Sequence, residues 1–179
     1  MTVSLIKPEM TSSDRFSFIK SQWKRLTGGS EVGFDNETYL AEAGTAHRNW
    51  TLAYMMLDAG AFPDYIKNNN DLKDTLELYF MTCSLTITAQ QMAVLGATLA
   101  NGGVNPITKE RVFSAANVRN CLSIMASCGL YDYSGEFAFK VGVPAKSGVA
   151  GGIVTMQPGV VGLCTWSPPL GKLGSKSLF

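Results

Sequence analysis

Two polar side chains in the first half of the sequence, Glu42 and Asn49, have types and a spacing that could bind an amino acid. They are seven residues apart, which is two helical turns, so a helix would place them on one face. A carboxylate accepts hydrogen bonds from an ammonium group, and an amide donates to a carboxylate. The pair fits a zwitterionic ligand, while the spacing alone favours a solvated polar face.

The tripeptide Lys146-Ser147-Gly148 is a second candidate, placed where one predicted β-segment turns into the next. In penicillin-recognising acyl-transferases, a Lys-Ser/Thr-Gly segment on an edge strand lines the cleft: the ammonium tunes the electrostatics and the hydroxyl binds a carboxylate. The small residues of 149–153 would let the backbone approach a ligand and donate N–H groups. A glycine-rich hairpin without a ligand is the alternative.

Other catalytic arrangements have weaker support. The S-x-x-K spacing occurs at Ser4 and Lys7, Ser17 and Lys20, and Ser21 and Lys24, but a chain of this composition contains about one such pair by chance. His47 is the only histidine, which excludes a multi-histidine metal site and makes a Ser-His-Asp triad improbable. We therefore do not expect a metal site at His47. Tyrosines 79, 131 and 133 are by default amphipathic residues at the edge of the core.

Periodicity predicts the elements that must position these residues. Apolar residues recur at helical spacing over 13–26, 36–57, 72–81, 88–100 and 115–125, with Ser114 as one cap and Gly60 as one stop. Short β-type segments follow at 136–143, 149–155 and 160–166, with turns at 144–148 and 157–159. Helices followed by an antiparallel hairpin pattern predict an α+β fold, helical over about 1–128 and sheet over about 136–170.

Composition sets outer limits on function. The 179 residues carry a formal charge of +1, with 46% apolar and 16% charged residues, which is typical of one globular domain and excludes disorder. The chain lacks the basic surplus that nucleic acid requires and the long apolar run that spans a membrane. Cys83, Cys121, Cys128 and Cys164 have no C-x-x-C spacing, so we predict reduced, buried thiols rather than a disulfide or zinc framework.

Three segments together resemble the serine-dependent glutaminases, which share the fold of β-lactamases and penicillin-binding proteins. They are MASCGLYDYSGEFAFKVGVPAKSGVAGGI at 125–153, LGATLANGGVNPIT at 95–108 and CTWSPPL at 164–170. The resemblance covers nearly all of the chain. It implies a β-lactamase-like α+β fold in which a helical cluster packs on an antiparallel sheet.

The resemblance also implies hydrolysis of L-glutamine to L-glutamate and ammonia through a serine acyl-enzyme, without a cofactor. Its substrate-binding residues map onto Glu42, Asn49, Tyr79, Tyr131, Ser147 and Val149, with Tyr131 relaying a proton and Lys146 in a supporting catalytic role. Relatives of this kind are intracellular, cytoplasmic or mitochondrial, and form homo-oligomers, which we take to be dimers or tetramers. No nucleic-acid or membrane partner is implied.

The sequence departs from the family pattern in three places. It has no N-P-x-x-N-A-G segment, and Ser4 aligns after that segment rather than with the nucleophile. His47 replaces an acidic residue, and the sequence diverges after Leu170. We therefore expect a partial catalytic domain, truncated at both ends, whose nucleophile lies upstream and which is inactive alone. A noncatalytic fragment that acts as a regulatory or interaction protein stays open, as does an unrelated amino-acid-binding module.

Overall fold

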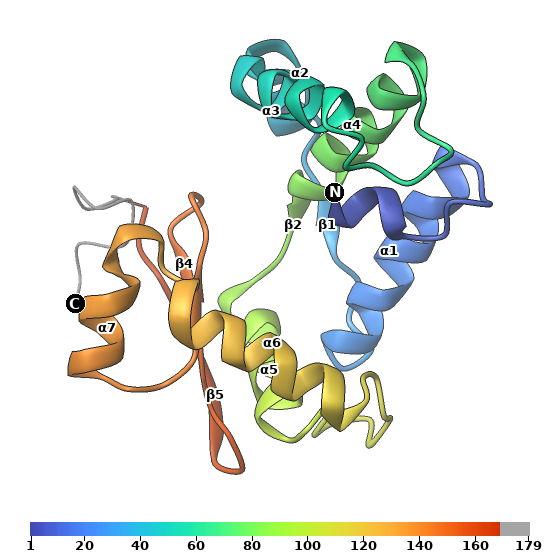
Figure 1. The fold of residues 1–179 in the computed structure, drawn as a ribbon. Coiled ribbons are helices and arrows are strands. Elements are labelled where there is room, and N and C mark those ends of the chain that lie inside the picture. The colour runs from blue at the N-terminus through green and yellow to red at the C-terminus, as the bar shows by residue number, and fades with distance from the viewer. Residues whose placement is uncertain (169–179) are drawn as a thin grey trace. The chain divides into compact units, whose positions relative to one another are not determined.

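The computed structural model describes residues 1–168, which form two compact units. Unit 1 comprises Met1–Gln22 and Val32–Thr86, and unit 2 comprises Trp23–Glu31 together with the residues from Ile87 onward. Figure 1 shows the elements of each unit. The predicted divergence after Leu170, and the last two residues of the CTWSPPL motif, lie outside the described residues.

Unit 1 is helical apart from one short antiparallel pair of strands. Its elements are η1 (Thr2–Leu5), the greater part of α1 (Ser12–Leu26), β1 (Gly33–Phe34), α2 (Asn36–Thr45), α3 (His47–Asp58), α4 (Asn69–Cys83) and β2 (Leu85–Thr86). The core joins α3 and α4 through buried apolar side chains, which are Ala46, Ala53, Ile66, Leu72, Leu76 and Phe80. Two side-chain caps fix helix starts: Asp35 accepts from the first turn of α2, and Asn68 does so for α4.

The single helix predicted over 36–57 is wrong, because the chain forms two helices separated at Ala46. Ala46 has φ −80° and ψ 30°, outside the helical region, and its side chain is buried in the core of unit 1. The chain therefore turns between the two helices at a residue that is itself part of the core. His47, predicted within a helix, is instead the exposed first residue of α3.

Unit 2 builds an antiparallel sheet between helices. Its elements are α5 (Ala89–Ala100), α6 (Ala115–Cys128), η2 (Tyr131–Tyr133), α7 (Ser134–Lys140), β3 (Ala145–Ser147), β4 (Gly152–Gln157) and β5 (Val161–Trp166), with sheet order β3-β4-β5. The predicted cap at Ser114 is confirmed, since its hydroxyl accepts from Asn117 N–H. Thr88 and Gln91 form a reciprocal capping box at the start of α5.

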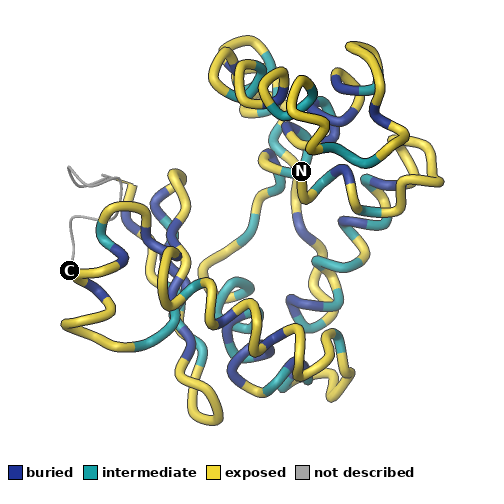
Figure 2. Tube along the Cα trace, viewed as in Figure 1, coloured by how far each residue is buried: buried dark blue, intermediate teal, exposed yellow. Residues whose placement is uncertain are grey.

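The two faces of the sheet pack against different helices. Successive residues of a strand point to opposite faces. In β4, Ile153 joins Leu130 and Phe137 in one cluster, whereas Val154 joins Leu99 and other residues of α5 and α6 in another. Figure 1 shows α7 and α5 on opposite sides of the strands, and Figure 2 shows the buried residues along β4.

The contact between α5 and β5 is made by backbone. A Cβ added to Gly162 of β5 would lie 2.0 Å from the Ala97 nitrogen of α5, and one added to Gly96 would lie 3.3 Å from the Gly162 Cα. Real Cβ atoms do not approach so closely, so this pairing requires glycine in the strand.

Two predictions for the sheet region are wrong. Residues 136–143 are not a strand, because Ser134–Lys140 forms α7, in which Ser134 and Phe137 are buried at helical spacing and Glu136 pairs with Lys140 one turn later. The predicted turn at 144–148 contains β3, whose Ala145 is buried against α7. The strands predicted at 149–155 and 160–166 are confirmed in approximate position as β4 and β5.

The cysteines correct a further prediction. Cys83, Cys121 and Cys128 are exposed, and Cys164 is half-buried. Each exposed cysteine lies on a helix, and the absence of C-x-x-C spacing did not indicate this exposure. Among residues 1–168 the four cysteines form no disulfide.

Candidate functional site

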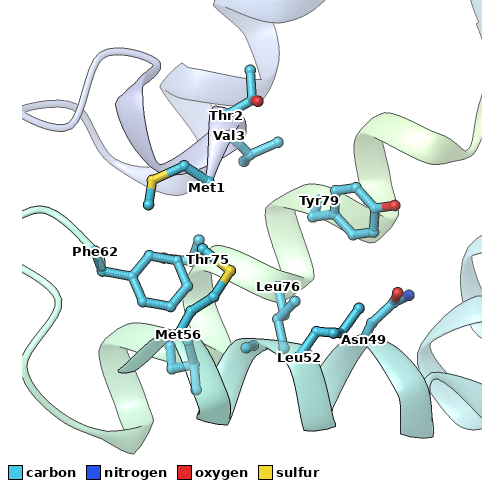
Figure 3. A pocket seen from close by; sticks show the side chains of 12 residues that line it. Met1, Thr2, Val3, Asn49, Leu52, Met56, Phe62, Thr75, Leu76 and Tyr79 are labelled. Atoms are coloured by element: carbon cyan, nitrogen blue, oxygen red, sulfur yellow. The ribbon is translucent and has the colours of Figure 1, made fainter. Parts of the chain in front are cut away.

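The predicted site residues of unit 1 include two that line one pocket of about 270 Å³. Asn49 lies on α3 and Tyr79 on α4, and the rest of the pocket is mostly apolar, including Leu52, Met56 and Phe62. In Figure 3 the Asn49 amide and the Tyr79 hydroxyl lie on the same side of the pocket, away from Phe62. The pocket therefore combines an apolar wall with two neutral hydrogen-bonding groups at one side.

Glu42 lies on α2, so it does not share a helix face with Asn49 as the spacing predicted. It is half-buried and is not among the residues that line the pocket. The negative charge of its carboxylate nevertheless raises the pKa of Cys83 on α4, and the Cys83 thiol forms a hydrogen bond with Tyr79. The pair predicted from one helix is thus presented by two helices, and Glu42 lies close enough to Cys83 for its charge to affect that thiol.

The pKa of Cys83 reflects the surroundings that it shares with Glu42 and Tyr79. Desolvation around the sulfur raises the pKa of the thiol above its usual value, the Tyr79 hydrogen bond lowers it, and the Glu42 carboxylate raises it again. Both raising effects disfavour a thiolate. Cys83 is therefore a neutral neighbour of the predicted binding groups rather than a nucleophile.

In unit 2, Lys146 and Tyr131 are in direct contact. The Lys146 ammonium lies 4.9 Å from the centre of the Tyr131 ring, a cation–π geometry, and it donates to the Ser147 carbonyl at 2.5 Å. Burial lowers the pKa of Lys146, and Cys128 partly opposes the shift. The predicted supporting lysine and proton-relay tyrosine thus share one electrostatic environment.

Ser147 and Val149 occupy different positions in the hairpin. Ser147 is the last residue of β3, and its buried Oγ has no hydrogen-bond partner within residues 1–168. A buried hydroxyl without a partner is costly, and a bound carboxylate would supply one. Val149 lies in the turn between β3 and β4, with its side chain 70% exposed.

Close packing at Gly129 places Tyr131 beside β3. The Ser147 N–H donates to the Gly129 carbonyl at 3.1 Å, and a Cβ on Gly129 would lie 1.7 Å from the Ala145 oxygen. Only glycine lets the end of α6 approach the strand this closely. Two residues later the chain reaches Tyr131, within range of Lys146.

Comparison with known proteins identifies this architecture. The family model described as Glutaminase matches residues 1–177. The chain belongs to the glutaminase family. The glutaminase liver isoform, mitochondrial, of Rattus norvegicus is 44% identical over 96% of this chain, and the glutaminase of Nostoc sp. is 38% identical over 97%.

Solved glutaminase structures share the fold. The structure of the probable glutaminase YbaS has a TM-score of 0.87 and 38% identity over 98% of this chain. The fold is therefore the predicted β-lactamase-like α+β fold of glutaminases. The chain spans 28% of the rat protein, 50% of the Nostoc protein and 54% of the solved chain.

Two of the S-x-x-K pairs, Ser4 with Lys7 and Ser21 with Lys24, do not form a serine–lysine dyad. The Ser4 hydroxyl donates to the Met1 carbonyl, while Lys7 pairs with Glu9 and lies over the Phe18 ring. Ser21 donates to the Phe18 carbonyl, and Lys24 pairs with Glu31. These lysines are directed to carboxylates rather than to the serine hydroxyls.

Sequence reasoning missed Cys83 and Ser134, which touch predicted site residues. Cys83 follows Tyr79 by four residues, so helical spacing on α4 was the available signal. Ser134 forms hydrogen bonds with the Leu130 N–H and the Tyr131 carbonyl, and no sequence pattern indicated this role. Within residues 1–168 no group of His, Cys, Asp and Glu is arranged to hold a metal ion, and no helix there is long and apolar enough to cross a membrane.

The lowered pKa of Lys146 predicts a pH dependence of stability. Between the lowered native pKa and the ordinary value of 10.5, the unfolded chain binds more protons than the folded chain, so stability rises with pH in that window. We expect the wild type to gain stability relative to Lys146→Met as the pH is raised from 7.5 toward about 10. Urea unfolding of both proteins measures the difference in stability, and a difference that does not change with pH would contradict the lowered pKa of Lys146.

Proposed function

We propose that the complete protein is a glutaminase that hydrolyses the side-chain amide of L-glutamine to L-glutamate and ammonia. The observation that carries this proposal is the glutaminase family match over residues 1–177. It is supported by two sets of polar residues, one in each unit, whose types suit a zwitterionic amino acid. No metal or organic cofactor takes part in the proposed reaction.

In unit 1, we assign Glu42, Asn49 and Tyr79 to substrate binding. The Glu42 carboxylate suits the α-ammonium of glutamine, and the Asn49 amide suits its α-carboxylate. The Tyr79 hydroxyl, which lies on the same side of the pocket as the Asn49 amide, supplies a further hydrogen bond. A neutral thiol at Cys83 adds no competing charge.

In unit 2, we assign Tyr131 to proton transfer, with Lys146 supporting it. A serine oxygen attacks the amide carbon, the carbon–nitrogen bond breaks, and the departing nitrogen takes a proton through the Tyr131 phenol to leave as ammonia. Water then cleaves the glutamyl ester, which releases glutamate and restores the serine hydroxyl. The buried Ser147 hydroxyl and the Val149 backbone contact the substrate, and the serine nucleophile is none of the S-x-x-K serines of this chain.

We further propose that the protein acts inside the cell, in the cytoplasm or in mitochondria, as a homo-oligomer. The mitochondrial designation of the rat relative supports the first point. Sedimentation of the complete protein would test the second, with a dimer or tetramer as the expected species.

Ammonia release by the complete protein tests the proposed activity. Glutamine should be consumed with one ammonia and one glutamate formed per turnover. Binding of glutamine without release would favour the noncatalytic, interaction role, and preferential binding of other amino acids would favour an unrelated binding module.

Glu42→Gln tests the substrate-binding assignment. Removal of the carboxylate should raise KM for glutamine by about 10-fold or more, with a smaller change in kcat, because a charge-assisted hydrogen bond to the ammonium is lost. The same change should lower the pKa of Cys83, since Glu42 raises it, and iodoacetamide kinetics measure that effect separately. Glu37→Gln, on the exposed first turn of α2, is the matched control and should keep the wild-type KM.

A further inference from the structure

Tyr131 has an unusual backbone for an aromatic residue. Its φ is +54°, in the left-handed region that favours glycine. A residue stays in this region only where its surroundings hold it there. The structure must therefore contain groups that fix the backbone on either side of Tyr131.

The Ser134 hydroxyl contacts the backbone on both sides. Its oxygen accepts a hydrogen bond from the Leu130 N–H at 2.9 Å, and its O–H donates to the Tyr131 carbonyl at 2.7 Å. The Leu130 N–H and the Tyr131 carbonyl lie on either side of the peptide bond that joins the two residues. Hydrogen bonds to both groups therefore restrict rotation about φ of Tyr131. Ser134 is 8% exposed and begins α7, so the hydroxyl is itself held in place.

Burial does not hold the Tyr131 side chain. The residue is 52% exposed, and the contact with the Lys146 ammonium lies on one ring face. Leu130, in contrast, is 2% exposed and anchored in the cluster with Phe137 and Ile153. The direction of the exposed phenol is therefore set chiefly by the backbone conformation that follows the Leu130 anchor.

We infer that Ser134 is a positioning residue of the proposed reaction: its hydroxyl fixes the left-handed backbone of Tyr131 and thereby aims the phenol beside the Lys146 ammonium. The inference rests on the proposed function for its kinetic consequence. Its structural part, that Ser134 controls the placement of the Tyr131 ring, is independent of the reaction.

The kinetic test is a double-mutant cycle in the complete protein. Ser134→Ala should reduce kcat for glutamine by about 10- to 100-fold, because a small misplacement of a reacting group has effects of this size, while KM changes little. Ser134→Thr, which retains the hydroxyl, should recover most of the loss. In a Tyr131→Phe background, Ser134→Ala should have almost no further effect on kcat, because the phenol that it positions is absent.

Ser84→Ala is the matched control for stability. Ser84 is buried and its hydroxyl donates to the Phe80 carbonyl at 2.8 Å, so this variant also loses a buried serine hydrogen bond. It should lower the melting temperature with kcat unchanged. Equal kcat losses for Ser134→Ala with and without the Tyr131 phenol would overturn the inference, as would failure of Ser134→Thr to recover activity.

A measurement without turnover separates this inference from the proposed function. In protein labelled with ¹³C-tyrosine, the ring resonance that disappears in Tyr131→Phe belongs to Tyr131. Ser134→Ala should shift or broaden it, and Ser84→Ala should not. An unchanged Tyr131 resonance in Ser134→Ala would overturn the inference. If the resonance shifts in Ser134→Ala but the wild type releases no ammonia from glutamine, only the proposed function is overturned.

Discussion

Gly129→Ala is expected to lower the free energy of unfolding by about 3 kcal/mol, the upper part of the range for overpacking. The added Cβ would lie 1.7 Å from the Ala145 oxygen and 2.6 Å from the Met125 oxygen, and both are backbone atoms. Neither can rotate away, so the end of α6 must separate from β3. Urea unfolding measures the loss, and faster amide exchange at Ser147, which donates to the Gly129 carbonyl, would locate it.

Gly135→Ala is the control for this prediction. Gly135 lies within α7, and a Cβ there meets nothing within 4 Å. Alanine should leave stability unchanged or raise it by about 0.5–1 kcal/mol, because glycine is unfavourable in a helix. If the two alanine variants were equally stable, the close approach of α6 to β3 would be refuted.

Tyr131→Phe is expected to reduce kcat for glutamine by about 100-fold or more, within the range for loss of a general acid–base group. The ring that faces the Lys146 ammonium is retained, so the cation–π contact and the melting temperature should change little. Steady-state kinetics of the complete protein, with thermal unfolding in parallel, measure both quantities.

Tyr133→Phe provides the comparison two residues away. Tyr133 packs edge-on against Phe137, with ring centres 6.2 Å apart, and its ring belongs to the cluster beneath α7. Removal of its hydroxyl should leave kcat close to that of the wild type, because Tyr133 is not assigned a part in proton transfer. A similar loss of kcat in both variants would mean that the Tyr131 phenol has no particular role.

The sequence was sufficient for helices with clear boundary signals. Ser114 and Thr88 carry caps that local hydrogen bonding fixes, so α5 and α6 were predicted in nearly their observed positions. The break at Ala46 was not predicted, although Gly44 lies two residues before it, because the apolar spacing continues across it and Ala46 is itself part of the core. The residues of α7 were mistaken for a strand because Phe137 and Phe139 alternate, yet Phe139 is 92% exposed and only Phe137 joins the core.

The candidate site residues come from the sequence and the family resemblance, whereas their geometry could not be predicted from either. Glu42 and Asn49 came from spacing and from the family resemblance, and the helix break then placed them on α2 and α3. The contact of Lys146 with Tyr131 joins residues fifteen positions apart in the sequence and depends on the approach at Gly129. The role of Ser134 depends on the left-handed φ of Tyr131, which composition and periodicity do not encode.

The contact between α5 and β5 has a mechanical consequence. Gly96 and Gly162 bring a helix and a strand together with no side chain between them. Elements packed through side chains can shift past one another when those side chains change rotamers. Two backbones in direct contact have no such freedom, so any sliding would make them clash. The pair α5 and β5 therefore behaves as one rigid block at this contact.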